Sequence, residues 1–352
     1  MVQTNEPDPM AIVPDNHVDD TDSLISRHGV VHCKRLKLDS KLPSREWEDI
    51  SCIQRRKKVA VFGASGNFGT PITAALTKAS FDVTIITRSE STSTFPEGLP
   101  VTRTAYTLEA LTNVLAGQDA VVCVVGPAGI NLQATMVDAA EAAGVKRFII
   151  DDFGWGPGFT SFPEFEPIRA QRTVGVDRAR ERSEANPSFT WTAIASGNPI
   201  DWALKRFPTM GFDIAKRSAV IYDDGTESFS GTTLQGIGQS VVGVFHHPNE
   251  TANRFVSVMS IKVCQNELLA AFQEGTGSQW AIQRSTARDL VDGARRKNEK
   301  GERGWILDLA VAQLYKEDGV CCLVAPSREE SDSDLLGVPE ETAQSLVASI
   351  LG

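Results

Sequence analysis

No apolar run in this chain of 352 residues approaches the roughly 18 residues that a membrane-spanning helix requires. The six cysteines include no Cys-x-x-Cys pair and the five histidines are not spaced like metal ligands, so neither a disulfide scaffold nor a metal site is expected. Residues 1–22 are acidic and do not show the basic-then-apolar order of a secretory signal. These features predict a cytoplasmic protein without membrane contact.

Basic residues are also outnumbered, with 35 Lys and Arg against 45 Asp and Glu and a net charge of −10. Binding to nucleic acid requires a positive surface, so no nucleic-acid partner is expected. A small-molecule substrate is the expected partner, and we expect a monomer or a homodimer. The hydrophobic fraction of 41% is typical of a soluble globular protein, and the length allows one large domain or two moderate ones.

The pattern of residues divides the chain into three parts. Residues 1–55 have weak periodicity and predict a mostly disordered extension, although a wrongly assigned start of the reading frame is an alternative. From residue 56 to 200, apolar runs alternate with helical segments, which predicts α/β structure with a Rossmann-type, doubly wound parallel sheet. The expected strands are 59–62, 81–87, 101–104, 120–125, 147–150 and 189–195, and the expected helices are 67–78, 108–115 and 132–143.

After Pro199 the alternation weakens, which predicts a smaller α/β substrate lobe over residues 201–352, with helices that return to the Rossmann domain. Its acidic, serine-rich stretch 327–334 is expected to be an exposed loop. The Gly-, Pro- and Phe-rich stretch 151–167 predicts an ordered loop where open α/β sheets bind ligands. The expected elements of the lobe are strands at 218–222 and 254–259 and helices at 233–245, 263–274, 287–297, 306–316 and 340–351.

Residues 63–69 read Gly-Ala-Ser-Gly-Asn-Phe-Gly, which matches the pattern G-x-x-G-x-x-G. By chance alone such a pattern occurs in roughly one chain in five of this glycine content, so its context decides. Here an apolar strand precedes it and a helix follows, which favours a dinucleotide site over a mere connecting turn. The expected cofactor contacts in this loop come from Gly63, Ser65, Gly66, Asn67, Phe68 and Gly69.

The second expected strand ends at Arg88, 19 positions after Gly69. NAD-specific sites place an acidic residue near this position, where it binds the ribose 2′-hydroxyl. A guanidinium instead pairs with a 2′-phosphate that a carboxylate would repel. The sequence therefore favours NADPH, although Glu90 leaves NADH open and a solvated strand-end charge is the alternative interpretation of Arg88.

From Lys57 onward, over nearly 300 residues, the chain resembles the NmrA-like, isoflavone-reductase-like group of atypical short-chain dehydrogenases. The motifs that carry the resemblance are residues 63–69, Thr87-Arg88, Val125-Gly126-Pro127, and 146–149 leading to Phe153-Gly154. Residues 196–199, Ser-Gly-Asn-Pro, followed by Asp201-Trp202, resemble the fungal oxidoreductase branch. The resemblance implies a Rossmann domain, NADPH and a substrate cleft under the C-terminal lobe. Gly126, Phe153 and Asn198 are added to the expected cofactor-binding residues.

The usual proton donor of short-chain dehydrogenases, Tyr-x-x-x-Lys, does not occur in this chain. The resembled family usually carries a lysine on the helix after the Phe-Gly loop, and alignment of residues 166–172 places Arg172 there. Arginine stays protonated and is a poor proton donor, but it can anchor a ribose or stabilise an oxyanion.

The mechanism expected from these residues is hydride transfer from NADPH to a C=O, C=N or conjugated C=C bond of a small organic molecule, in specialised metabolism. Arg172 would stabilise negative charge, and Asp152, Tyr222 or water would supply the proton. Asp152 is alternatively a hydrogen-bond acceptor that orders its loop, and Tyr222 a strand residue that packs on the sheet. Trp202, Phe153 and Trp155 are candidates for an apolar pocket wall or for the core.

Two other functions stay open at this point. The first is a regulator that binds NADP(H) as a redox signal without turnover, which the replaced lysine favours. The second is a non-redox isomerase or cyclase that keeps the nucleotide as a scaffold. Fold alone does not decide between them.

Overall fold

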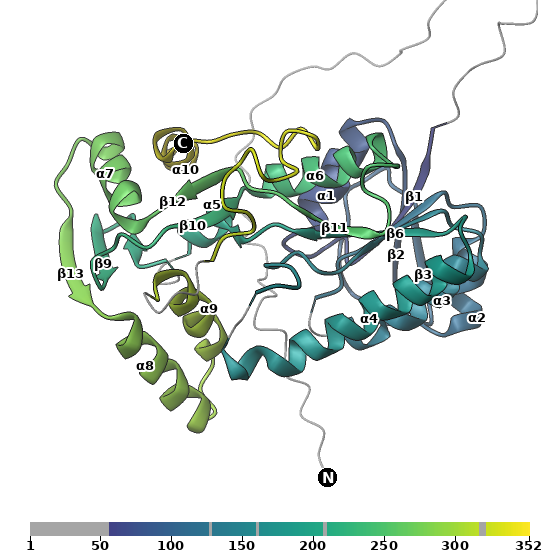
Figure 1. The fold of residues 1–352 in the computed structure, drawn as a ribbon, viewed down its shortest axis with the longest axis horizontal. Helices are drawn as coiled ribbons and strands as arrows, with labels where there is room; N and C mark the ends of the chain where they lie inside the picture. Colours follow the sequence, from purple (N-terminus) through teal and green to yellow (C-terminus); the bar gives the residue numbers. More distant parts are fainter. Residues whose placement is uncertain (1–55, 127–128, 160–161, 207–209, 317–321) are drawn as a thin grey trace, which may run out of the picture. The chain divides into compact units, whose positions relative to one another are not determined.

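Seven parallel strands form the main sheet of this computed structural model (Figure 1). The structure describes residues 56–126, 129–159, 162–206, 210–316 and 322–352, and residues 57–352 belong to one unit. The expected extension over residues 1–55 lies outside the described residues. In spatial order the strands are β11 (Arg254–Ser257), β6 (Thr190–Ala195), β5 (Arg147–Ile150), β4 (Ala120–Cys123), β1 (Lys58–Phe62), β2 (Asp82–Arg88) and β3 (Val101–Thr104).

Helices cover both faces of this sheet (Figure 1). One face packs against α1 (Gly69–Lys78) and α6 (Leu234–His246), whose Ile72 and Ile237 share a core with β-strand residues such as Val59. The other face packs against α2 (Leu108–Leu115), α3 (Gln133–Ala142) and α4 (Glu166–Ala185). The central strands β1, β4, β5 and β6 are therefore buried on both sides, which explains their continuous apolar runs, and the predicted doubly wound Rossmann-type fold is confirmed.

The strand at 254–257 corrects one expectation, because the sequence pattern assigned 254–259 to the second lobe. β11 instead pairs in parallel with β6 and extends the main sheet. The buried guanidinium of Arg147 supports this edge: it donates hydrogen bonds to the hydroxyls of Thr190, Thr192 and Thr251 at 2.8–3.0 Å, and to the carbonyl of Pro248. The division into a Rossmann domain over residues 56–200 and a substrate lobe over residues 201–352 stays a proposal.

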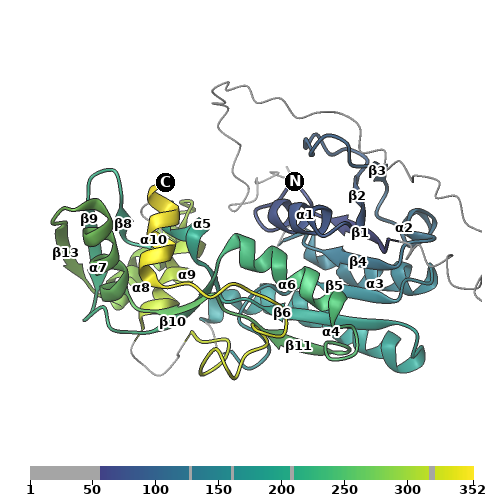
Figure 2. The same ribbon diagram turned by 90° about the horizontal axis from the view of Figure 1, so that it is seen from above.

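The remaining elements build two small three-stranded sheets and five helices around a second core (Figure 2). One sheet contains β7 (Asn198–Pro199), β10 (Phe229–Thr232) and β12 (Ile261–Val263), and the other β8 (Phe212–Asp213), β9 (Ser218–Tyr222) and β13 (Ala281–Ser285). The helices are α5 (Ile200–Leu204), α7 (Gln265–Thr276), α8 (Ala287–Glu299), α9 (Trp305–Tyr315) and α10 (Ala343–Leu351). Short 3-10 turns lie at Ile130–Leu132 and Pro163–Phe165.

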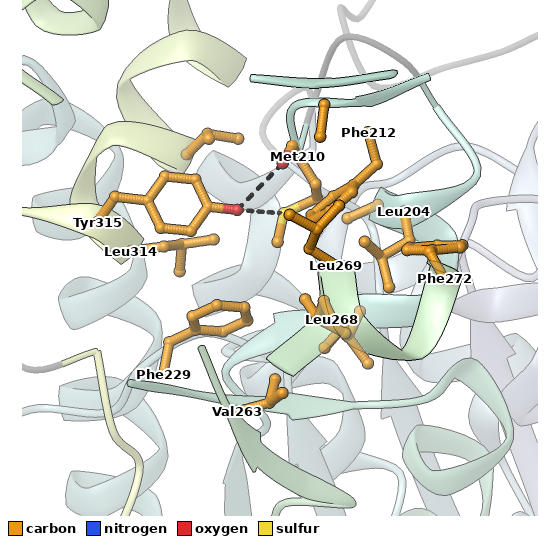
Figure 3. Close-up of a cluster of buried hydrophobic side chains, with 14 of the residues drawn as sticks. Leu204, Met210, Phe212, Phe229, Val263, Leu268, Leu269, Phe272, Leu314 and Tyr315 are labelled. Carbon is orange, nitrogen blue, oxygen red and sulfur yellow. Dashed lines mark hydrogen bonds between the residues drawn. The ribbon is translucent and has the colours of Figure 1, made fainter. Parts of the chain in front are cut away.

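Figure 3 shows how this second core is tied together. The buried Tyr315 donates a hydrogen bond from its hydroxyl to the carbonyl oxygen of Met210 at 3.2 Å. Leu204, the last residue of α5, is 1% exposed and belongs to the same cluster. The core of the C-terminal part therefore anchors the short helix α5, which lines the cleft described below.

The stretch 327–334 is not simply an exposed loop, as expected, because it docks on the rest of the fold. Asp332 pairs with Arg254 at 2.6 Å, and the fully buried hydroxyl of Ser333 accepts a hydrogen bond from the Met259 amide at 2.9 Å. In the described parts of the chain, every helix is too short or too polar to cross a membrane, and no cluster of side chains is suited to a metal ion.

Candidate functional site

The glycine loop joins β1 to α1 in the first βαβ unit, and two of its glycines are required by space. Gly63 has a left-handed backbone (φ 76°), and a Cβ there would collide with the carbonyl oxygen of Val124. A Cβ on Gly69 would collide with the carbonyl of Gly63 and lie 2.8 Å from Ala64 Cα. Gly66 has more room and closes the turn by donating its N–H to Gly63 O at 3.0 Å. The loop is thus held tightly against the start of α1.

The start of α1 suits an anion. In α1, all of whose residues are described, no side chain caps the N-terminus and the first turn contains no acidic residue. The helix dipole and the amides of the first turn therefore favour a bound negative group. A tight glycine loop at a helix N-terminus that no acid neutralises fits the diphosphate of a dinucleotide.

Arg88 lies at the end of β2, next to β1 in the sheet. Its side chain is 59% exposed, and its Nε lies 3.6 Å from the Glu90 carboxylate. An exposed pair of this kind contributes little to stability, so the guanidinium is available to exchange this partner for a phosphate.

The expected cofactor residue Gly126 is fixed by Asp151. Gly126 has a left-handed backbone (φ 64°) and donates its N–H to Asp151 Oδ2 at 2.7 Å. The backbone N–H of Asp151 donates in turn to Gln133 Oε1 at 2.7 Å. Burial raises the pKa of the Asp151 carboxyl, against the opposing influence of Arg172 and the Gly126 amide. Asp151 therefore orders the ends of β4 and β5, while Asp152 accepts a hydrogen bond from the backbone N–H of Gly154 in the following loop.

The structure brings Asp152 and Arg172 together, as the proposed mechanism requires. Asp152 Oδ1 lies 3.8 Å from Arg172 Nη1, and the two side chains are 15% and 30% exposed. Burial raises the pKa of Asp152, while the nearby Arg172 opposes this shift. The Nε of Arg172 is buried without a hydrogen-bond partner among the described residues. A carboxyl whose pKa is raised by burial thus lies beside a guanidinium at the end of β5.

Phe153 follows Asp152 directly and Asn198 follows the end of β6, and both side chains are largely buried. The Phe153 ring, 4% exposed, packs against Phe68 of the glycine loop at a centroid distance of 5.9 Å. Asn198, 8% exposed, donates from Nδ2 to the sulfur of Met210 at 3.4 Å. Trp155 stacks on Phe159 and would touch a side chain at Gly197. Phe153 therefore contacts the glycine loop directly, whereas Asn198 faces the second core.

Tyr222 is placed in a different environment from Asp152 and Arg172. Its ring stacks on Tyr315 at 5.4 Å in the core of the C-terminal part, and burial, with a further contribution from Asp308, raises the pKa of its hydroxyl. Among the described residues, no interaction links Tyr222 to Asp152 or Arg172. The structure thus joins only two of the three expected catalytic side chains.

A cleft of about 290 Å³ opens beside the glycine loop. One side consists of the loop and the first turn of α1, and the other of α5 and the first residue of α6. Trp202 on this second side is among the residues that the sequence predicts, whereas no motif or spacing marks Lys205 and Arg206. The residues that line the cleft are Ser65, Gly66, Asn67, Thr70, Pro71, Asp201, Trp202, Lys205, Arg206 and Leu234.

The parallel sheet, the covering helices and the glycine loop together define a Rossmann-type α/β protein. A model of the NmrA-like family matches residues 55–163. The oxidoreductase poxI of Penicillium oxalicum is 64% identical over 288 residues, which are 82% of this chain and 92% of that protein. The chain therefore belongs to the NmrA-like, isoflavone-reductase-like family, which confirms the resemblance of its motifs.

Solved structures share this fold. The crystal structure of an isoflavone reductase aligns with a TM-score of 0.64 and 19% identity, over 84% of this chain and 98% of that chain. The triphenylmethane reductase of a Citrobacter species, complexed with NADP(H), aligns with a TM-score of 0.62 and 17% identity, over 82% of this chain and 99% of that chain. At these identities the likeness concerns the fold.

Proposed function

We propose that the protein is an NADPH-dependent oxidoreductase that reduces a C=O, C=N or conjugated C=C bond of a small organic molecule. The observation that carries the proposal is the glycine loop, in which Gly63 and Gly69 leave no room for a side chain at the start of α1. The name of the Penicillium oxalicum relative, an oxidoreductase, and the NADP(H) held by the Citrobacter reductase support the proposal.

Each predicted cofactor-binding residue is assigned to one part of NADPH according to its place in the fold. The glycine loop would hold the diphosphate, and Arg88 would pair with the 2′-phosphate at the end of β2. Gly126 and Phe153 would lie toward the reacting end, and Asn198 would contact the cofactor only by giving up its hydrogen bond to Met210. A bound, reduced nicotinamide supplies a hydride, and the chain's own residues must supply the charge stabilisation and the proton.

Asp152 and Arg172 divide these two tasks. Arg172 would stabilise negative charge that develops on the substrate, and an arginine side chain is a poor proton donor. The raised pKa of Asp152 allows its carboxyl to hold a proton at higher pH than an exposed aspartate. A proton held at Asp152 Oδ is therefore available 3.8 Å from the guanidinium. Tyr222 and water stay as alternative proton sources.

The test follows the absorbance of reduced nicotinamide when the protein is mixed with NADPH and a panel of aldehydes, imines, enones and quinones. We expect turnover with at least one class of acceptor, and we expect Arg88→Asp to lower the apparent NADPH affinity at least about tenfold, since it converts attraction for the 2′-phosphate into repulsion. If the wild type and Arg88→Asp each turned over NADH as fast as NADPH, the role of Arg88 would be contradicted.

A second function is favoured by one observation, the arginine at the position where the family usually has a lysine. If the Asp152–Arg172 pair serves only to order the site, the protein would bind NADP(H) and report the redox state to a partner. Tight NADPH binding without turnover on the whole panel would support this reading, or that of a non-redox isomerase or cyclase. Arg172→Lys distinguishes further, because a gain in turnover would identify the proton donor as the missing part.

A further inference from the structure

We propose that Lys205 and Arg206, on the α5 side of the cleft, bind the diphosphate of the dinucleotide and so complete the anion site that the glycine loop begins. The inference rests on the proposed cofactor. The cleft of about 290 Å³ is lined on one side by Ser65, Gly66 and Asn67 of the loop, and on the other by the two cations. A phosphoryl group on the loop therefore faces positive charge across the cleft.

The local charge is unusual for this chain, whose net charge is −10. Two of the residues that line the cleft are cations and one, Asp201, is an anion. Asp201 Oδ1 accepts hydrogen bonds from the backbone N–H groups of Trp202 and Leu234, both at 2.9 Å. The Asp201 carboxylate therefore links α5 to α6. Among the described residues, neither Lys205 nor Arg206 forms an ion pair, so both charges remain for a ligand.

Arg206 is held in position by Trp202. Its guanidinium lies over the indole ring at 4.3 Å from the centroid, and Nη1 donates to the Trp202 carbonyl at 3.4 Å. A stacked guanidinium keeps its remaining N–H groups in a fixed plane, which suits two oxygens of a phosphate. Partial burial lowers the pKa of Arg206, so a bound anion would also compensate the cost of desolvating this cation.

Trp202 supplies an independent sign of a ligand. It lines the cleft and is 8% exposed, yet its indole N–H is buried without an acceptor among the described residues. A buried donor of this kind is costly unless a partner satisfies it. The wall itself is anchored, because Leu204 of α5 is packed in the core shown in Figure 3.

The diphosphate is common to NADPH and NADH, whereas the 2′-phosphate that Arg88 would bind occurs only in NADPH. The experiment therefore titrates both dinucleotides by calorimetry into the full-length protein, into Lys205→Gln/Arg206→Gln and into Arg88→Ala. We expect the double variant to weaken both dinucleotides by the same factor, about tenfold or more, since charge-assisted hydrogen bonds are lost. Arg88→Ala should weaken NADPH alone.

The matched control is Lys78→Gln, which removes one exposed charge at the opposite end of α1 and should leave both affinities unchanged. Raising the salt concentration should weaken NADPH binding less steeply in the double variant than in the wild type. If the double variant does not keep the wild-type melting temperature, Arg206→Lys and Arg206→Gln are compared instead. Arg206→Gln should lose most of the affinity due to Arg206, whereas Arg206→Lys, which keeps the charge but not the planar pair of donors, should lose only part of it.

Three results would overturn the proposal. Affinities within twofold of the wild type for both dinucleotides would exclude a role of the two cations in binding the diphosphate. A loss confined to NADPH would assign them to the 2′-phosphate. An unchanged cofactor affinity together with a raised KM for a carboxylate-bearing substrate would assign them to the substrate. In each of these cases the wild type still binds NADPH, whereas a wild type that binds neither dinucleotide refutes the proposed function itself.

Discussion

Gly69→Ala tests the packing of the glycine loop, because it reverses the usual effect of this substitution in a helix. Gly69 begins α1 and its backbone is not left-handed, so alanine is compatible with its conformation. In open surroundings alanine would stabilise the helix by about 1 kcal/mol relative to glycine. Here its Cβ would meet the Gly63 carbonyl and lie 2.8 Å from Ala64 Cα, closer than side chains approach backbone atoms.

Both contacts are with backbone, so the collision is relieved only if the loop moves away from α1. Overpacking of this kind costs about 1–3 kcal/mol, which cancels or exceeds the gain of about 1 kcal/mol in helix propensity. We therefore expect a net loss of up to about 2 kcal/mol in the free energy of unfolding. Because the displaced loop carries the diphosphate site, we also expect NADPH affinity to fall about tenfold or more.

Gly293→Ala is the matched control, since Gly293 lies inside α8 and its added Cβ would meet only the end of Arg296, at 3.8 Å. It should stabilise the protein by about 0.5–1 kcal/mol and leave NADPH affinity unchanged. Urea unfolding gives the stability and calorimetry the affinity. If Gly69→Ala stabilises the protein as the control does and binds NADPH like the wild type, the close packing of loop and helix is wrong.

Three further predictions concern the groups behind the site. Since burial raises the pKa of Asp152, a proton donor at this position is active below that pKa, so turnover should fall as the pH rises through it, and Asp152→Asn should lose this pH dependence in a kcat profile. Arg147→Met leaves three threonine hydroxyls without their donor and should cost about 3 kcal/mol in urea unfolding, whereas Arg180→Met, which removes an exposed pair, should cost less than about 1 kcal/mol. Gly175→Ala would press its Cβ on the Gln133 amide and shift α4, so it should destabilise by about 1–3 kcal/mol instead of stabilising, and an unchanged urea midpoint would contradict this packing.

The sequence was sufficient for six strands of the main sheet and for the glycine loop, because both depend on local patterns. Buried parallel strands are short apolar runs, and the loop needs glycine at fixed positions whatever lies elsewhere. The assignment of β11 failed because its pairing with β6 depends on contacts between residues far apart in the chain, with Arg147 as the link. No local pattern records such a contact.

In the candidate site, too, some residues are indicated by local motifs and others are brought together only by the fold. Asp152 and Arg172 were found through the family motif, and the structure places them 3.8 Å apart. Two adjacent cations shortly after a tryptophan do not form a recognisable binding motif, so the sequence does not indicate Lys205 and Arg206. Their candidate role follows only from the fold, which packs α5 beside the glycine loop. Asp151 was passed over since its bond to the Gly126 amide joins two separate strand ends.

Calorimetric titration of the intact protein with NADPH and with NADH tests the central claim most directly. The account predicts measurable binding of NADPH, weaker binding of NADH, and a loss of this preference in Arg88→Asp. An absence of binding heat with both dinucleotides, confirmed by the absence of any effect on the melting temperature, would contradict it.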